Sequence, residues 1–317
     1  MKELQKGKRV NTREGKPRVS VGLPTFNRVE SLRTAIESVL AQDYPDLELV
    51  ISDNASTDGT QQLCEAFARS DRRVRYFRQP QNRGATANFQ EVLDRARGEF
   101  FMWLADDDWI DPSYISTCTR VLLRDPASVL AAGRVGYYEG ARQLSEEPPL
   151  LLDSDNPRER VFRYFRRVGT NGTFYGVMRR SVLASVPIRP CLGGDWLLIA
   201  SMALLGKVRT APEVMAYRSV AGVSRDVAKL AASLGLPRVF QRNPHLYIAL
   251  KAFQDITWES PVYRSLGAAS RLLLAIRVFS LFMLRFYIAV PIRKLRSKLQ
   301  ESQANGSRVP LPGEANS

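Results

Sequence analysis

Residues 18–105 alternate between strand-like runs and amphipathic stretches, and no other feature of the sequence constrains the fold as strongly. The β-rich runs are RVSVGL (18–23), LELVISD (47–53), RVRYFRQ (73–79) and EFFMWLA (99–105). Between the first two runs, Leu32, Ile36 and Val39 recur at the spacing of one helical face. Strands that alternate with helices of this length predict βαβ units and a parallel sheet covered on both faces.

A polar turn follows each predicted strand. These turns are PTFNR (24–28), SDNASTDGT (52–60), QPQNRG (79–84) and ADDD (105–108). Open α/β sheets bind ligands in the crevice at the carboxyl ends of their strands, so the four turns are expected to converge on one cleft. There Asp53 can accept a hydrogen bond from a nucleotide base. The turn at Asn82 and Arg83 lets backbone and guanidinium approach a phosphate.

Three consecutive carboxylates, Asp106, Asp107 and Asp108, end the fourth strand. They cannot all ionise cheaply in a partly buried cleft unless a cation neutralises them. Mg²⁺ and Mn²⁺ take oxygen ligands and usually keep waters and substrate phosphates in their coordination shell. The motif therefore predicts a divalent metal that bridges to a diphosphate. Taken alone, it is equally consistent with a solvated acidic turn in which Asp111 caps the next helix.

The composition narrows the functional classes. A chain of 317 residues with 44% apolar residues can form a core, and its net charge of +14 suits anionic partners. A nucleic-acid-binding protein is not favoured, because no helix-turn-helix, RNP or zinc-finger pattern occurs and the cleft motifs are acidic. A dinucleotide-dependent oxidoreductase is not favoured either, because the turn after the first strand lacks GxGxxG.

The cysteines and the N-terminal sequence indicate a protein that is not secreted, and the single histidine bears on catalysis. Cys64, Cys118 and Cys191 form no CxxC pair, which argues against a disulfide framework or a zinc site and favours a reducing compartment. The single histidine, His245, is more consistent with a structural role than with catalysis. Residues 1–17 are basic and polar without the apolar stretch of a signal peptide, so we expect a flexible N-terminal segment on a cytoplasmic protein.

The turn motifs, in this order, resemble those of the inverting glycosyltransferases of family 2, which have the GT-A fold. The resemblance is specific over residues 18–112 and looser over 113–224. It implies an α/β fold, a Rossmann-like mixed sheet flanked by helices, with a nucleotide-binding half followed by an acceptor half. It also implies metal-dependent, inverting transfer of a sugar from a nucleotide-diphosphate sugar to a hydroxyl of a saccharide or lipid-linked acceptor, in cell-surface polysaccharide or glycolipid synthesis.

Site residues follow from the resemblance and from the turns themselves. The expected nucleotide-sugar ligands are, by the resemblance, Pro24, Thr25, Asn27 and Asp53 and, by their places in the turns, Arg28, Asn82 and Arg83. The family's metal-binding DXD element maps onto residues 106–108. Asp108 is the expected direct ligand of Mn²⁺ or Mg²⁺ and Asp106 the second, while Asp106 and Asp107 contact the nucleotide sugar. Ala105 replaces a further Asp that many members have.

Asp195, in the sequence GGDW, is the expected catalytic base, which takes the proton of the acceptor hydroxyl. The family places this base in a Glu-Asp pair at a helix start, and here Gly194 replaces the Glu. An ordinary N-cap role would explain Asp195 equally well without the resemblance. Members often carry a His that helps to hold the diphosphate; this chain lacks it, and the candidates to replace it are Arg218, Ser224 and Arg225.

Residues 225–300 are expected to form a helical, basic extension and residues 301–317 a disordered tail. The apolar part of the extension contains Arg277 and Arg285, and each central Arg would be penalised by roughly 2.5–3.5 kcal/mol in a spanning helix. We therefore expect a helix in the membrane interface, with residues 265–300 making a peripheral contact on the inner face of the cell membrane. Packing on the globular domain, or on a second subunit of a homo-oligomer, is the alternative.

Two other functions are compatible with the same turns. A sugar-phosphate nucleotidyltransferase would also bind a nucleotide and a metal at acidic strand ends. A non-catalytic nucleotide-binding protein would need the turns but not the base. The product separates the two enzymes, because glycosyl transfer releases a nucleoside diphosphate and nucleotidyl transfer releases pyrophosphate.

Overall fold

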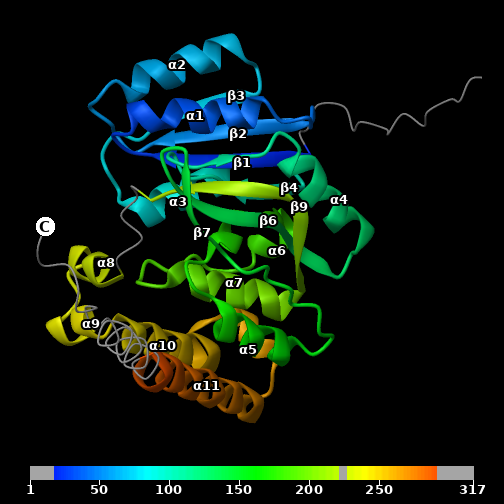
Figure 1. Ribbon diagram of the computed structural model, residues 1–317, viewed down its shortest axis with the longest axis vertical. Helices are drawn as coiled ribbons and strands as arrows, with labels where there is room; N and C mark the ends of the chain where they lie inside the picture. The colour runs from blue at the N-terminus through cyan, green and yellow to red at the C-terminus, as the bar shows by residue number, and fades with distance from the viewer. Residues whose placement is uncertain (1–17, 221–226, 291–317) are drawn as a thin grey trace, which may run out of the picture.

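A mixed β-sheet forms the centre of the molecule (Figure 1). The computed structural model describes residues 18–220 and 227–290. Within them, nine strands form one sheet in the order β3-β2-β1-β4-β8-β6-β9-β5, and β7 pairs with β6 beside this row. The strands are β1 (Val19–Thr25), β2 (Leu47–Asp53), β3 (Val74–Arg78), β4 (Phe100–Trp103), β5 (Trp109–Ile110), β6 (Ser128–Glu139), β7 (Arg142–Glu146), β8 (Val177–Arg179) and β9 (Lys207–Ser219).

Helices cover the sheet and form a separate layer at one end. The α-helices are α1 (Val29–Leu40), α2 (Thr60–Ser70), α3 (Ala85–Arg95), α4 (Tyr114–Arg124), α5 (Pro157–Arg167), α6 (Arg180–Leu183), α7 (Gly194–Leu205), α8 (Val227–Ser233), α9 (Arg238–Arg242), α10 (Pro244–Gln254) and α11 (Ala268–Phe282). The 3-10 helices are η1 (Gly172–Tyr175) and η4 (Pro261–Ser265), and the π-helical turns are η3 (Asp255–Glu259) and η5 (Met283–Ala289).

The βαβ units expected in the first half are confirmed. β1 pairs in parallel with β2 and β4, and β2 pairs in parallel with β3. α1 buries Leu32, Ile36 and Val39, the three residues that the helical spacing predicts. In the register of the first pair, Thr25 lies opposite Asp53, so the polar turns after both strands begin at the same edge of the sheet.

The second half is mixed rather than parallel. β8 lies antiparallel between β4 and β6, and β5 is antiparallel to β9, whereas β6 and β9 run parallel. β7 lies in a polar stretch where the sequence pattern favours a loop. All five of its residues are exposed, so it lacks the alternation of apolar and polar residues by which a strand is recognised.

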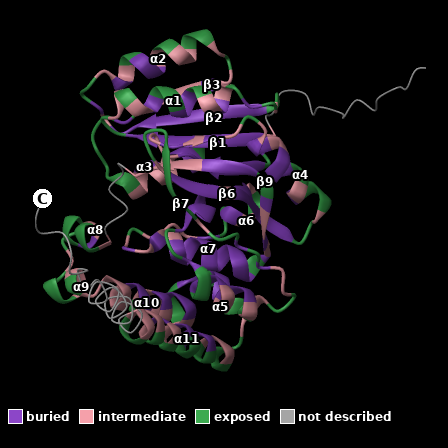
Figure 2. Ribbon diagram, in the orientation of Figure 1, coloured by how far each residue is buried: buried purple, intermediate pink, exposed green. Residues whose placement is uncertain are grey.

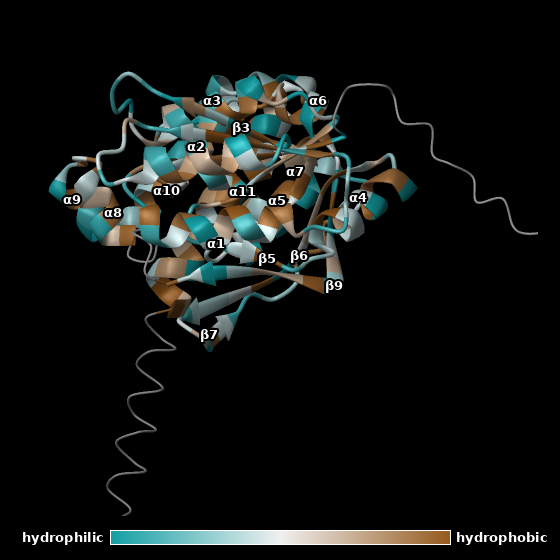
Figure 3. Ribbon diagram, turned by 90° about the horizontal axis from the view of Figure 1, so that it is seen from above, coloured by the Kyte–Doolittle hydropathy of each residue, from teal (hydrophilic) through white to brown (hydrophobic). Residues whose placement is uncertain are grey.

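Apolar side chains form one hydrophobic cluster on each face of the sheet, and the buried strands and α7 stand out in Figure 2. α7 is buried almost all round, as its uninterrupted apolar sequence predicts. The outer helices carry both teal and brown residues in Figure 3, the mixture expected of helices with one buried face. The larger cluster continues from the sheet through α7 and α5 into the C-terminal helices.

α11 packs on the globular domain with one face only. The ring centroid of Phe282 lies 5.6 Å from that of Phe165 in α5 and 6.1 Å from that of Trp196 in α7. The opposite face of α11 and η5 exposes large apolar side chains, namely Leu272, Leu273, Ile276, Leu284 and Ile288. We call these five residues the apolar stripe. One face of this helix thus packs on the globular domain, whereas no described residue covers the apolar stripe.

Several predictions concern residues outside the described ranges. These are the flexible N-terminus (1–17), the end of the basic extension (291–300), the tail (301–317), and Ser224 and Arg225 as candidate phosphate ligands.

Candidate active site

The polar turns after β1, β2 and β4 meet at one edge of the sheet. The Thr25 hydroxyl donates a 2.8 Å hydrogen bond to Oδ2 of Asp106, which joins the first turn to the acidic one. The buried amide of Asn88 in α3 donates to the carbonyls of Thr25 and Ser52, at 3.2 and 2.9 Å. Pro24 pairs with Ser52 in the register of β1 and β2. Three of the four turns that were predicted to converge therefore lie together at one edge of the sheet.

The first turn is held rigidly to the turn that follows β2. Asn27 adopts the left-handed conformation with φ 53°, which asparagine tolerates better than most residues. Its side-chain oxygen accepts from the Thr57 amide at 2.8 Å, and its own amide donates to the Ser56 hydroxyl at 2.9 Å. The Arg28 amide donates to the Thr60 hydroxyl at 3.3 Å. These bonds fix the backbone of residues predicted to contact the nucleotide.

Asp53 is fully buried at the end of β2. Its Oδ1 accepts from the Ser56 amide at 2.8 Å, and its Oδ2 accepts from the Tyr76 hydroxyl at 2.9 Å. Arg78 adds an ion pair at 3.7 Å. Each carboxylate oxygen has a second lone pair beyond these hydrogen bonds, so the group can still accept from a base N–H.

The third turn is organised around Asn54. The Asn54 side chain donates to Oδ1 of Asn82 at 2.8 Å and accepts from the Arg83 amide at 2.9 Å. The Arg83 guanidinium is half-exposed and lies 3.6 Å from Glu91. Asn54 is a supporting residue that the sequence reasoning missed, although it follows the second-strand Asp directly.

The triple carboxylate is partly neutralised by a distant arginine. Arg218, at the end of β9, donates from Nε to Oδ2 of Asp108 at 3.1 Å, and the Ser219 amide donates to Oδ1 at 2.9 Å. Burial raises the pKa of Asp108 to about 6, with Arg218 opposing the rise and Asp107 adding to it. Burial also raises the pKa of Asp106 to about 6. The ion pair with Arg218 and the raised pKa values of Asp106 and Asp108 together reduce the repulsion among the three carboxylates.

Asp111 does not cap the helix that follows. The N-cap position of α4 is Ser113, without a side-chain cap bond. Asp111 instead accepts from the Met215 amide at 2.8 Å and from the Tyr217 hydroxyl at 2.7 Å, which ties the acidic turn to β9. The acidic turn is thus anchored in the fold rather than simply solvated.

Arg218 connects the acidic turn with the loop before η1. Its guanidinium lies over the rings of Tyr137 and Tyr175, 5.5 and 4.7 Å from their centroids. It also donates to the Tyr137 hydroxyl and the Thr170 carbonyl, both at 3.4 Å. Arg218 was one of three candidates from sequence, and its position between two parts of the site is visible only in the structure.

Asp195 is the second residue of α7, and the N-cap position is Gly193 in the left-handed conformation. The Asn171 amide nitrogen donates to Oδ2 of Asp195 at 2.7 Å, and the buried Tyr164 hydroxyl donates to Oδ1 of Asn171 at 2.8 Å. Burial raises the pKa of Asp195, while the Asn171 hydrogen bond, the backbone amides of Trp196 and Asp195 and, last, the charge of Arg218 oppose the rise. Gly193 rather than Asp195 holds the N-cap position, but the Asp195 carboxylate still accepts from backbone amides at the start of α7, so a role at the helix start and a role as base both remain compatible with the structure.

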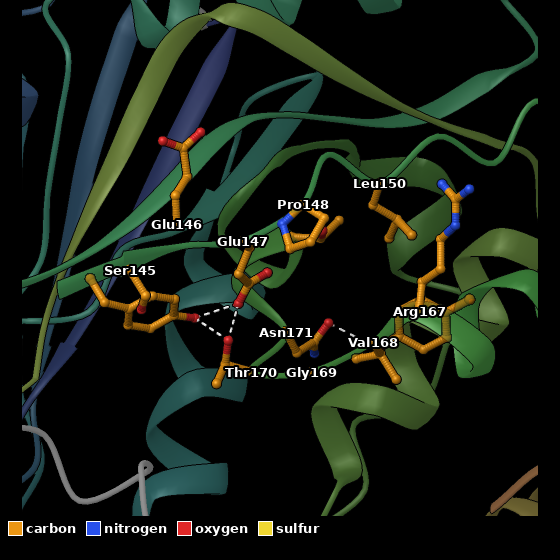
Figure 4. A pocket seen from close by; sticks show the side chains of 13 residues that line it. Ser145, Glu146, Glu147, Pro148, Leu150, Arg167, Val168, Gly169, Thr170 and Asn171 are labelled. Atoms are coloured by element: carbon orange, nitrogen blue, oxygen red, sulfur yellow. Dashed lines mark hydrogen bonds between the residues drawn. The ribbon is translucent and has the colours of Figure 1, made fainter. Parts of the chain in front are cut away.

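A cavity of about 600 Å³ lies beside this network (Figure 4). Tyr137, Tyr164, Thr170 and Asn171 contribute to its wall, so it adjoins the hydrogen-bond network of Asp195. Glu147 also lines it and accepts from the Tyr137 and Thr170 hydroxyls and the Gly172 amide. Glu147 was missed by sequence reasoning, because it lies in a polar stretch without a recognisable motif.

Comparison with known families finds a match to the model described as "Glycosyl transferase family 2", over residues 20–186. This range covers more than half of the chain and contains the first four turns, but not Asp195 or Arg218.

A curated relative is the GalNAc(5)-diNAcBac-PP-undecaprenol β-1,3-glucosyltransferase of Campylobacter jejuni. It is 40% identical over 171 residues, which are 53% of this chain and 53% of the relative. The match thus spans about half the length of that relative.

Two solved structures have a similar fold. Staphylococcus aureus TarS 1–349 in complex with UDP-GlcNAc superposes with a TM-score of 0.60 at 15% identity, over 85% of this chain and 73% of TarS 1–349. The Pyrobaculum calidifontis mannosyltransferase PcManGT in complex with GDP-Man and Mn²⁺ gives a TM-score of 0.50 at 17% identity, over 90% and 80% of the two chains. At these identities the likeness concerns the fold alone.

Proposed function

We propose, from the premise that the chain belongs to glycosyl transferase family 2, that it transfers a sugar from a nucleotide-diphosphate sugar to an acceptor hydroxyl with inversion. The observation that carries this proposal is the position of Arg218. This one guanidinium pairs with Asp108 at the nucleotide-type turns and also donates to the Tyr137 hydroxyl and the Thr170 carbonyl, which belong to the wall of the cavity. A donor site and an acceptor site thereby share a cation where the leaving diphosphate would develop charge.

The donor would bind at the carboxyl ends of β1 to β4. Pro24, Thr25 and Asn27 would form the backbone wall, with Asp53 accepting from the base. Asn82, Arg83 and Arg28 would complete the wall on either side, and Asp106 and Asp107 would contact the ribose and the sugar. The solved complexes of TarS with UDP-GlcNAc and of PcManGT with GDP-Man support a nucleotide sugar as the ligand class.

The acidic turn fits a divalent cation whose coordination the donor's phosphates complete. The described residues contain no group of three or more His, Cys, Asp or Glu side chains that could hold a metal by themselves. Mg²⁺ and Mn²⁺ commonly bind through one or two carboxylates together with substrate phosphates, and residues 106–108 can supply these oxygens. Asp108 and Asp106 would hold the ion, which would supply positive charge at the diphosphate. The Mn²⁺ in the PcManGT complex supports a divalent metal ion as the kind of cofactor.

Asp195 would act as the base. Asn171 and the backbone amides at the start of α7 orient the carboxylate, which would take the proton of an acceptor hydroxyl as that hydroxyl attacks the anomeric carbon. Arg218 would exchange its contact with Asp108 for the donor's phosphates, which frees Oδ2 of Asp108 as a ligand. Because attack occurs opposite the leaving diphosphate, one displacement inverts the configuration.

The products of the reaction test this function. With Mn²⁺ and a panel of UDP-, GDP- and dTDP-sugars, we expect one donor to raise the melting temperature and to yield free nucleoside diphosphate when acceptor is present. A donor at 100 times its Kd adds about 2.7 kcal/mol to the free energy of unfolding. Release of pyrophosphate instead would identify a nucleotidyltransferase. Binding without any product would identify a nucleotide-binding protein.

The acceptor would be a saccharide or a lipid-linked saccharide in cell-surface polysaccharide or glycolipid synthesis, as the name of the Campylobacter relative supports. The segment Ala268–Ala289 is long and apolar enough to cross a membrane by length and composition, with a mean hydropathy of 1.9. Two of its three arginines contact α5: Arg285 donates to the Phe165 carbonyl at 3.0 Å, and Arg277, although exposed, lies 4.4 Å over the Phe162 ring. With these two guanidinium groups on α5, the apolar stripe would lie in the inner face of the cell membrane.

Charges in the apolar stripe should reduce membrane binding. Leu273 and Ile276 are 62% and 47% exposed, so replacing both by Glu should leave the fold intact. Burying one such side chain contributes about 1.5–3 kcal/mol, so we expect the double variant to partition at least about tenfold more weakly into anionic vesicles. The measurement is liposome flotation.

A matched control is Leu123→Glu in α4, since Leu123 is 45% exposed but lies far along the chain from the apolar stripe. Equal flotation of the double variant and this control would contradict the membrane contact. If the double variant binds vesicles as before but loses a dimer seen by sedimentation, a second subunit would be the partner of the apolar stripe.

A further inference from the structure

The cavity beside Asp195 has an end that neither the donor site nor the base uses. Arg167, the last residue of α5, lines it and is exposed, and none of the described carboxylates forms an ion pair with its guanidinium. In Figure 4, Leu150 and Val168 lie beside Arg167, whereas Glu147 lies apart from them near Thr170. The cavity therefore has one end with a cationic and two apolar side chains and an opposite end with a carboxylate.

Glu147 retains capacity to bind a ligand. The Tyr137 and Thr170 hydroxyls both donate to its Oε1, and the Gly172 amide spans both oxygens at 3.0 and 3.1 Å. Oε2 thus receives only the amide and can still accept a hydrogen bond. A carboxylate held in this way is suited to hydroxyl groups, which donate, and not to a phosphate, which is negative.

The end of the cavity at Arg167 instead favours a negatively charged group. A guanidinium forms bidentate, charge-assisted hydrogen bonds with a phosphate. A volume of about 600 Å³ lies within the range of pockets for small ligands. We infer that the cavity binds a phosphorylated sugar of the acceptor, with Glu147 accepting from sugar hydroxyls and Arg167 pairing with the phosphate. This inference rests on the proposed function.

The position of α5 connects the cavity with the apolar stripe. Tyr164 and Arg167 face the cavity, whereas Phe162 and Phe165 on the same helix contact Arg277 and Phe282 of α11. Packed helices have axes about 8–10 Å apart, so one helix layer separates the cavity from the helix that carries the apolar stripe. A phosphosugar whose phosphate is esterified to a lipid could therefore reach the cavity from a membrane surface; a free sugar phosphate has the same polar chemistry.

Direct binding tests the inference on the full chain, with a nucleoside diphosphate and Mn²⁺ present. The probes are undecyl diphosphate glycosides of glucose, galactose, N-acetylglucosamine and N-acetylgalactosamine, the four free sugar 1-phosphates, and the four undecyl glycosides without phosphate. Isothermal titration calorimetry should detect binding of at least one phosphorylated probe. Tighter binding of the lipid form than of the free phosphate would identify a lipid-linked source, and equal binding a soluble one.

The variants assign the two ends of the cavity. Arg167→Gln should weaken binding of the phosphorylated probe about tenfold to a hundredfold, which corresponds to the free energy of a charge-assisted hydrogen bond. Arg158→Gln removes the same charge from the other end of α5 and should leave binding unchanged. Glu147→Gln should weaken the binding of phosphorylated and unphosphorylated sugars by the same factor. Its melting temperature and nucleotide affinity should match those of the native chain.

Three results would overturn the inference while donor binding persists: no phosphorylated probe binds, the undecyl glycosides bind as tightly as their phosphates, or Arg167→Gln and Arg158→Gln have equal effects. If Glu147→Gln disturbs folding, the comparison of Arg167→Gln with Arg158→Gln still tests the inference. Failure of the proposed function would differ, because then no nucleotide sugar would bind or release its diphosphate.

Discussion

Replacing Asp195 by Asn should lower the rate of sugar transfer by roughly 10²–10⁴-fold, the usual contribution of a positioned general base. The side chain keeps its shape, and its oxygen can still accept from Asn171, so the loss would come from the missing basicity rather than from misfolding. The Kd of the nucleotide sugar should change little, because Asp195 lies on the acceptor side. The measurements are kcat with saturating donor and donor affinity by calorimetry.

The pH dependence of the rate provides an independent readout. Burial raises the pKa of Asp195, and a base must be ionised to accept a proton. Activity should therefore fall as the pH decreases through a pKa above the ordinary range of aspartic acid, and this acid limb should be absent from the residual rate of the Asn variant. Glu159→Gln, which neutralises an acid in the first turn of α5, is the matched control. Near-native transfer by Asp195→Asn would show that the base is another group.

Removal of divalent cations should reduce transfer roughly a hundredfold to a thousandfold. The stabilisation of a leaving diphosphate by a bound cation is worth several kcal/mol, and each 1.36 kcal/mol corresponds to a factor of ten in rate. Dialysis against EDTA followed by assay, and then addition of Mn²⁺ or Mg²⁺, measures the loss and its recovery. Full activity in EDTA would contradict a metal-dependent reaction.

Single variants locate the ligand within the acidic turn. Asp108→Asn should raise the Mn²⁺ concentration needed for half-maximal activity, because Asp108 is the proposed direct ligand. In the structure both of its oxygens contact Arg218 and Ser219, so this role requires the exchange of Arg218 described above. If Asp107→Asn raises the requirement and Asp108→Asn does not, then Asp108 is a partner of Arg218 and Asp107 is the ligand. Asp94→Asn, an exposed acid on α3, serves as the control.

Arrangements that depend on distant residues were beyond sequence reasoning. Arg218 meets Asp108 across 110 residues, and no local pattern identifies one arginine among so many. The same holds for Glu147, whose partners come from β6 and from the loop before η1. Asn171 is likewise recognisable only once α5 and α7 are packed together, because its bonds run to Tyr164 and Asp195.

The C-terminal helix illustrates how orientation changes an interpretation. The sequence places Arg277 and Arg285 within an apolar stretch, and their charge argues against a spanning helix. The structure directs both toward α5, which leaves the apolar stripe uninterrupted. Sequence alone could not decide this, because the side of a helix that faces the protein depends on the neighbour against which it packs.

By itself the sequence determined the βαβ units, the four polar turns, the acidic end of β4 and the place of Asp195 at the start of a buried helix. Each of these follows from periodicity and turn chemistry within a short window, where the physical causes are local. Only the tertiary structure decided which cation faces Asp108, which side chains orient Asp195, and where a cavity opens beside it. Those contacts join segments far apart in the chain, and their energies depend on burial and distance, which exist only after the sheet and its helices have packed.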